Sequence, residues 1–146
     1  MSHGLHRRAA LMETVIFACV HNAGRSQIAA AYFTALAAPD RARAISAGTQ
    51  PAEHVHPVVV EAMRERAIDI SANRPQRLTD EVARRGSLLV TMGCGDQCPY
   101  VPGLQREDWS IPDPKDLPLV EVRAIRDSIF QRVVALIDSR GWRLTL

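Results

Sequence analysis

The sequence predicts a single α/β domain with a four-stranded parallel sheet flanked by helices. Strand-like and helix-like segments alternate along the chain, a pattern typical of parallel strands joined by right-handed crossovers. The 146 residues suit one compact domain and leave no room for two. Hydrophobic residues make up 47% of the chain and charged residues 23%, close to globular averages, which excludes disordered and fibrous classes.

The pattern of hydrophobic residues predicts the strands and helices in the first half of the chain. A short apolar, β-prone run predicts a buried strand at 14–18, and an alanine-rich segment predicts a helix at 26–36 that ends before Pro39. A second strand is expected at 43–47, directly before Gly48. A helix is expected at 57–66.

The second half continues the alternation. Thr79 and the acidic residues after it have the features of a helix N-terminus and predict a short helix ending at Gly86. A third buried strand is expected at 87–92, and a short fourth strand around Trp109, which we expect to pack in the core. Hydrophobic residues at helical spacing predict a closing helix at 120–139.

Residues 1–11 are expected to form a flexible extension ahead of a domain at 12–146. Arg7 and Arg8 precede an apolar stretch, but Glu13 interrupts it and no small-residue cleavage site follows, so we expect no signal peptide. No apolar run approaches the ~18 residues of a membrane span. The net charge of +2 is too balanced to predict binding to nucleic acid or membranes. We therefore expect a monomer in the reducing cytoplasm, where its three cysteines are buried filler, metal ligands or reactive groups.

A cysteine, five residues and an Arg-Ser pair lie between the first strand and its helix. Backbone N–H groups in such a turn and at a helix N-terminus converge on one point and favour a tetrahedral oxyanion. Arg25 adds a planar fork for two anion oxygens, and the same positive field favours the thiolate form of Cys19. A buried cysteine beside an unrelated arginine is the alternative. The candidate oxyanion-binding residues are Val20, His21, Asn22, Ala23, Gly24, Arg25 and Ser26.

Three candidate reactive residues follow three different strands. Cys19 follows the first strand, Cys94 the third and Asp113 the fourth. Because the carboxyl ends of parallel strands meet at one edge of a sheet, we expect these residues to converge there. A carboxylic acid opposite the nucleophile can protonate the departing oxygen, and Asp113, stiffened by Pro114, is the candidate.

Four segments together resemble the low-molecular-weight tyrosine phosphatase superfamily, specifically its arsenate reductase branch. They are residues 15–29 (VIFACVHNAGRSQIA), 46–49 (SAGT), 91–99 (TMGCGDQCP) and 109–114, within a resemblance that covers roughly residues 13–140. The resemblance implies that Cys19 attacks arsenate and that Asp113 assists the loss of an oxygen. Cys94 then attacks the adduct and releases arsenite, and Cys98 resolves the Cys19–Cys94 disulfide.

The resemblance also implies partners and supporting residues. Thioredoxin is the implied electron donor, with a low-molecular-weight thiol such as mycothiol or glutathione, and a glutaredoxin-like protein, as the alternative. Arsenate is the implied substrate, phosphate and sulfate are its mimics, and no cofactor is bound. Ser46 is expected to fix the Asn22 side chain, and Ser26 to hydrogen-bond Cys19. Where related reductases carry an acidic residue of a potassium site, this chain has Ala30, so we expect no cation.

Residues at particular positions disfavour the alternative functions. A tyrosine phosphatase is disfavoured because Lys115 and Asp116 stand where that enzyme places aromatic residues, and Tyr100 is the only nearby candidate. A non-catalytic oxyanion- or arsenic-binding module would need no acid. We expect no metal, since a zinc set would have to pair the loosely spaced Cys94 and Cys98 with two histidines expected on solvated loops, His54 and His56.

Overall fold

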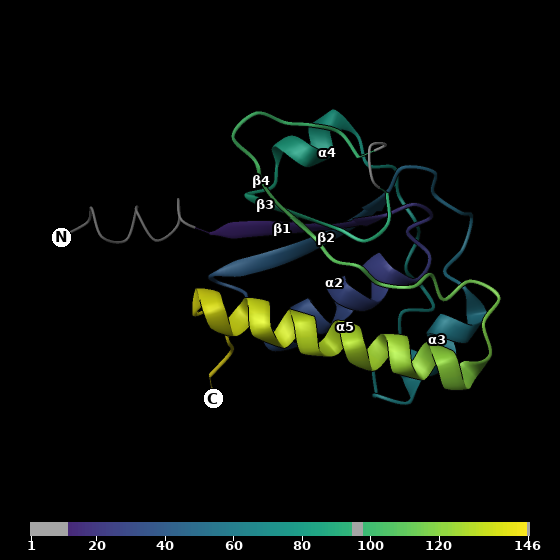
Figure 1. Ribbon diagram of the computed structural model, residues 1–146. Coiled ribbons are helices and arrows are strands. Elements are labelled where there is room, and N and C mark those ends of the chain that lie inside the picture. Colours follow the sequence, from purple (N-terminus) through teal and green to yellow (C-terminus); the bar gives the residue numbers. More distant parts are fainter. Residues whose placement is uncertain (1–11, 95–97, 146) are drawn as a thin grey trace.

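The computed structural model of the protein describes residues 12–94 and 98–145. Within these residues lies a four-stranded sheet of order β2-β1-β3-β4, in which every pair of neighbours is parallel (Figure 1). This confirms the predicted fold class. The strands are β1 (Glu13–Cys19), β2 (Ala42–Gly48), β3 (Leu88–Thr91) and β4 (Gln105–Asp108).

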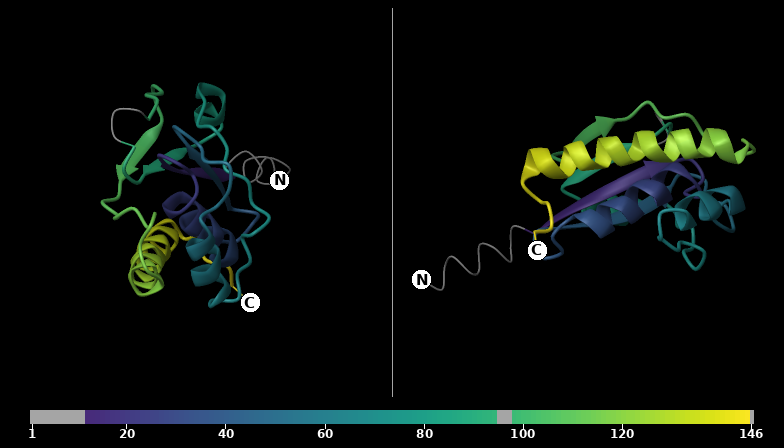
Figure 2. Two further views of the ribbon diagram at one scale, coloured as in Figure 1. Left: turned by 90° about the vertical axis from the view of Figure 1, so that its right-hand side faces the viewer. Right: turned by 90° about the horizontal axis from the view of Figure 1, so that it is seen from below.

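Helices cover both faces of the sheet (Figures 1 and 2). Three of them pack on one face and contribute to the larger hydrophobic cluster, whereas the short α4 packs on the other face. No helix in the described part of the chain is long and apolar enough to cross a membrane. The helices are α2 (Arg25–Leu36), α3 (Pro57–Arg64), α4 (Asp80–Arg84) and α5 (Leu119–Arg140).

The fourth strand is the one element displaced from its expected centre. β4 ends at Asp108, and Trp109 follows it rather than lying within it. The strand is mostly exposed at the sheet edge, so it has no apolar run to mark it. Trp109 itself is buried, as expected, with its ring 5.8 Å from that of Phe17. Thr79 caps α4 as predicted, because its side chain accepts a hydrogen bond from the Val82 N–H at 3.1 Å.

Successive residues of β1 point to opposite faces of the sheet, as strand geometry requires. Phe17 and Cys19 belong to the larger cluster, with the residues of α2, α3 and α5. Ile16 and Ala18 belong to the smaller cluster on the α4 side. The candidate nucleophile is therefore at the end of the central strand and on the face covered by α2.

Phe17 anchors the core beneath the functional edge. Its side chain is fully buried between Phe33 and Trp109, with ring centroids 5.8 Å away on both sides. Replacing Phe17 by alanine is expected to lower the free energy of unfolding by about 3–5 kcal/mol, because the variant loses buried area and leaves a cavity. Denaturant-induced unfolding measures this loss. The exposed Val120 is the control, and its replacement by alanine is expected to cost less than about 0.5 kcal/mol.

Candidate active site

The turn between β1 and α2, residues 19–26, forms what we name the anion loop. The backbone carbonyls of Cys19, Val20, His21 and Ala23 accept hydrogen bonds of 3.2, 2.8, 2.9 and 2.9 Å from N–H groups of the segment 49–56, which passes outside the loop. Because the C=O and N–H of one peptide plane point in opposite directions, these bonds turn the N–H groups of the next residues inward. Inward N–H groups at a helix N-terminus are what an oxyanion requires.

Cys19 is a buried free thiol held by the polar residues of its own loop. Its Sγ lies 2.9 Å from Oγ of Ser26, the hydrogen bond that we expected. The Ser26 oxygen accepts from Nδ2 of Asn22 at 2.7 Å, so the Ser26 hydroxyl hydrogen is available to a thiolate. Asn22 has a φ of 51°, in the left-handed region that asparagine tolerates.

Gln76 holds the amide oxygen of Asn22, and the expectation that Ser46 fixes this side chain is wrong. The backbone N–H of Gln76 donates to Oδ1 of Asn22 at 2.9 Å. Ser46 acts one step away, since its backbone oxygen accepts from Nε2 of Gln76 at 2.8 Å. The register explains the difference, because Ser46 lies opposite Phe17, two residues before the end of β1.

A second amide pair supports the anion loop, and no local pattern in the sequence predicts it. The buried Gln27 donates from Nε2 to the backbone oxygen of Asn22 at 3.0 Å. Its Oε1 accepts from Nδ2 of Asn73 at 3.1 Å. Gln27 therefore holds the backbone of Asn22, and Asn73 holds Gln27.

Arg25 connects the anion loop to the acid loop, residues 110–116. The Arg25 side chain is 9% exposed, and its Nη1 donates to the backbone oxygen of Ile111 at 3.1 Å. Its Nη2 lies 3.8 Å from Oδ2 of Asp113, whose side chain is 42% exposed. Oδ1 of Asp113 accepts from the Lys115 N–H at 3.0 Å. The structure thus brings the predicted acid to the predicted arginine, although 88 positions separate them in the sequence.

Gly93 leaves the space that the Arg25 guanidinium occupies. A Cβ at Gly93 would lie 2.5 Å from Nη1 of Arg25, and its φ of 93° disfavours any side chain. Replacing Gly93 by alanine is expected to displace the guanidinium and weaken phosphate binding by about tenfold or more, as calorimetric titration would measure. Gly103 is the matched control, because it has a φ of 83° but no atom within 4 Å of its Cβ position. Gly103→Ala is expected to lower stability and leave phosphate affinity unchanged; equal affinities in the two variants would contradict this role of Gly93.

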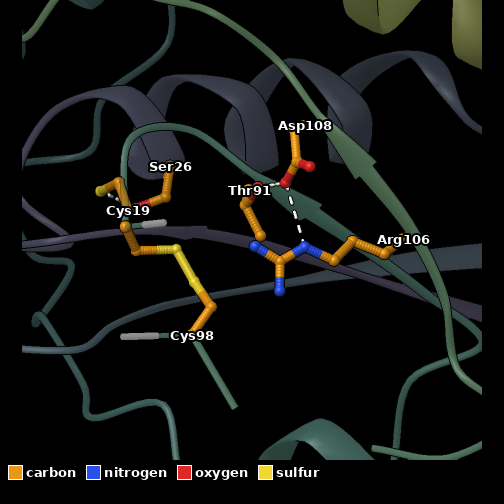
Figure 3. The surroundings of a disulfide bond; sticks show 7 residues. Cys19, Ser26, Thr91, Cys98, Arg106 and Asp108 are labelled. Atoms are coloured by element: carbon orange, nitrogen blue, oxygen red, sulfur yellow. Dashed lines mark hydrogen bonds and ion pairs between the residues drawn. A yellow bond between two sulfur atoms is a disulfide. The ribbon is translucent and has the colours of Figure 1, made fainter. Parts of the chain in front are cut away.

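Cys94 and Cys98 form a disulfide whose Cα atoms are 5.6 Å apart. Both residues are 5% exposed and pack with Ala18 on the α4 side of the sheet. Cys19 belongs to the cluster on the other side. Figure 3 shows the disulfide and Cys19 in one neighbourhood, so the three cysteines share the carboxyl edge of the sheet but not one face.

A polar cluster that the sequence did not indicate lies in the surroundings of the disulfide (Figure 3). Asp108 accepts hydrogen bonds from Oγ1 of Thr91 and, at 3.0 Å, from Nε of Arg106. These bonds, that of Thr91 foremost, hold the pKa of the Asp108 carboxyl below its usual value. The cluster ties the ends of β3 and β4 together, since Thr91 and Asp108 are partners in the strand register.

His56 lies against the anion loop, and the expectation of a solvated surface position is wrong for it. His54 is exposed as expected, but His56 is half-buried. Its backbone N–H donates to the Ala23 oxygen at 2.9 Å, which draws the start of α3 onto the loop. Among the residues that the structure describes, no three His, Cys, Asp or Glu side chains are grouped to hold a metal ion.

Comparisons with known proteins agree on one family. The family model for low molecular weight phosphotyrosine protein phosphatase matches residues 14–141. An arsenate reductase of Staphylococcus aureus is 33% identical over 121 residues, covering 80% of this chain and 90% of the relative. A solved thioredoxin-dependent arsenate reductase of Corynebacterium glutamicum is 37% identical, with a TM-score of 0.76 and coverage of 94% of this chain and 70% of that chain.

One further solved structure concerns the anion directly. It is an arsenate reductase in the phosphate binding state, 29% identical, with a TM-score of 0.74 and coverage of 88% of this chain and 98% of that chain. The family model, the relatives and the fold all agree with the resemblance found in the sequence. The chain belongs to the low molecular weight phosphotyrosine protein phosphatase family.

Proposed function

We propose that the protein reduces arsenate to arsenite with electrons from thioredoxin. The observation that carries this proposal is the Cys94–Cys98 disulfide at the sheet edge that also holds the anion loop. A phosphatase needs a nucleophile, an anion-binding arginine and an acid, and it has no use for two further thiols. The arsenate reductases among the relatives support the assignment.

The first step joins arsenate to Cys19. Arsenate is a tetrahedral oxyanion like phosphate, and it binds to the inward N–H groups of the anion loop and the Arg25 guanidinium. The Cys19 thiolate, stabilised by the Ser26 hydroxyl, attacks arsenic. Asp113 gives a proton to the oxygen that departs as water.

The next steps supply two electrons from two thiols. The Cys94 thiolate attacks the sulfur of Cys19, the S–As bond breaks with its electron pair on arsenic, and arsenite leaves as the Cys19–Cys94 disulfide forms. Cys98 attacks Cys94, which frees Cys19 and leaves a Cys94–Cys98 disulfide. That bond is present in the structure, which supports the proposal because it is what the relay leaves for thioredoxin to reduce.

The relay requires the segment that carries Cys94 to move. In the disulfide form Cys94 packs on the α4 side, whereas Cys19 is on the opposite side. Cys94 therefore has to pass around the sheet edge to reach Cys19, and the glycine before it gives the backbone the freedom to do so. We further propose that the reaction takes place in a cytoplasmic monomer, where thioredoxin restores the dithiol.

Phosphatase activity is the second candidate. The set of Cys19, Arg25 and Asp113 is sufficient for it, and the family model supports it. Against a phosphotyrosine substrate stand the exposed Lys115 and Asp116, which occupy the positions where tyrosine phosphatases of this family place aromatic residues. The side chain of Tyr100, the aromatic candidate of the sequence analysis, has an exposed fraction of 84%.

NADPH consumption in coupled assays tests the proposal. Purified protein is mixed with arsenate, thioredoxin and thioredoxin reductase, and in parallel with glutathione or mycothiol and its glutaredoxin system. Arsenate-dependent oxidation with thioredoxin is the expected result. Turnover with the small thiol alone would keep the reductase and remove thioredoxin as donor. Inactivity in both assays, together with hydrolysis of an aryl phosphate, would identify a phosphatase.

A further inference from the structure

His56 lies where the anion loop and the acid loop meet. A Cβ built on Gly24 would lie 2.6 Å from Cγ of Pro114 and 3.6 Å from Cδ2 of His56. The imidazole and the proline ring therefore both approach Gly24, one from the start of α3 and the other from the acid loop. The hydrogen bond from the His56 N–H to the Ala23 oxygen fixes this approach.

Titratable groups of the anion loop and the acid loop act on His56. Partial burial lowers the pKa of His56 below its usual value; of its neighbours, Asp113 raises the pKa, His21 and Lys115 lower it, and Asp116 raises it. Burial is the strongest of these effects. In the anion-free protein at neutral pH the imidazole is therefore mostly neutral, next to a loop built to receive negative charge.

We propose that His56 takes up a proton when a dianionic oxyanion enters the anion loop, so that the site binds oxyanions more tightly at lower pH. The inference rests on the proposed function, because it requires an oxyanion beside Gly24. A dianion in partly buried surroundings favours the imidazolium over the neutral ring. Since the complex then holds one more proton than the free protein, affinity falls as pH rises from the free to the bound pKa of His56 and is constant below that range.

His56 acts here through charge, as a positioning residue for the anion, and not through bond making. A merely structural His56 would cap α3 and hold the loop through its backbone, and its imidazole would not respond to the anion. The pKa of the imidazole in the presence and absence of an anion separates the two roles. Sulfate is a suitable probe because it stays a dianion throughout the titration range of histidine.

The test is an NMR pH titration of the imidazole C–H resonances with and without saturating sulfate. His56→Asn and His54→Asn assign the two resonances, and asparagine at position 56 still suits a helix N-terminus. Sulfate is expected to raise the pKa of His56 by about 0.5 to 1, equivalent to about three- to tenfold in affinity, and to leave that of the exposed His54 unchanged. In His56→Asn the pH dependence of the sulfate dissociation constant is expected to shrink by the same factor, whereas His54→Asn retains it.

Four results would overturn the inference. An unchanged pKa of His56 in saturating sulfate, or an equal rise at His54, would contradict it and leave arsenate reduction untouched. The rise at His56 must also persist in a His21→Asn background, where the other nearby imidazole is removed. If sulfate does not move the backbone amide resonances of the anion loop at all, the loop binds no oxyanion, and the proposed function fails together with the inference.

Discussion

Replacing Cys19 by serine is expected to lower arsenate turnover at least about 1,000-fold while phosphate or sulfate binding is kept. The serine hydroxyl is not ionised at neutral pH and cannot replace the thiolate as nucleophile. Binding depends on the inward N–H groups and on Arg25, none of which changes. Affinity is expected to equal or exceed that of the wild type, because the thiolate no longer repels the anion. Steady-state assays and phosphate titration measure the two effects separately.

Ser26→Ala is expected to lower turnover less than Cys19→Ser does. It removes the hydroxyl 2.9 Å from Sγ but keeps the thiol. We expect a loss of about 10- to 100-fold in turnover, because the attacking sulfur loses the hydroxyl that hydrogen-bonds it. Full activity in Cys19→Ser, or loss of phosphate binding in a folded Cys19→Ser, would contradict the assignment of Cys19 as the nucleophile.

Replacing Cys94 by serine is expected to abolish multiple turnover, because it blocks the step that follows the attack of Cys19 on arsenate. Cys19 can still attack arsenate, but no internal thiol is placed to take its sulfur and release arsenite. Rapid-quench measurement of arsenite is expected to give far less than one equivalent per chain in the absence of added thiol. The phosphatase-like reaction with an aryl phosphate, which needs only Cys19, Arg25 and Asp113, is expected to stay close to its wild-type rate.

That second activity is the control for folding in Cys94→Ser. A variant that loses both reactions has lost its structure, whereas one that loses only arsenate reduction has lost the relay. If Cys94→Ser reduced arsenate at the full steady-state rate with thioredoxin, the external protein would have to attack Cys19 directly. The intramolecular relay would then be wrong.

The anion loop could be predicted from the sequence because its determinants are local. Cys19, Arg25 and Ser26 lie in one strand-to-helix turn, so a short motif and two flanking elements define the site. Convergence of Asp113 on Arg25 could also be expected, since parallel strands place their carboxyl ends at one edge. The parallel arrangement of the strands therefore makes most of the site predictable from the sequence.

The amides that support Asn22 could not be predicted, because contacts between distant segments position them. The hydrogen bond from Gln76 to Asn22 joins residues 54 positions apart, and the bond from Asn73 to Gln27 joins residues 46 apart. No local pattern distinguishes these amides from surface residues. The position of His56 could not be predicted for the same reason, since only the tertiary structure brings the start of α3 against the anion loop.

The central claim, that two thiols of one chain reduce one arsenate, is tested most directly in fully reduced Cys98→Ser. This variant is treated with arsenate in the absence of any other reductant, arsenite is quantified, and the disulfides are mapped by mass spectrometry. The account predicts about one arsenite per chain and a peptide pair joined through Cys19 and Cys94, because Cys98 is no longer present to resolve that bond. Absence of arsenite, or arsenite formed without a Cys19–Cys94 disulfide, would contradict it.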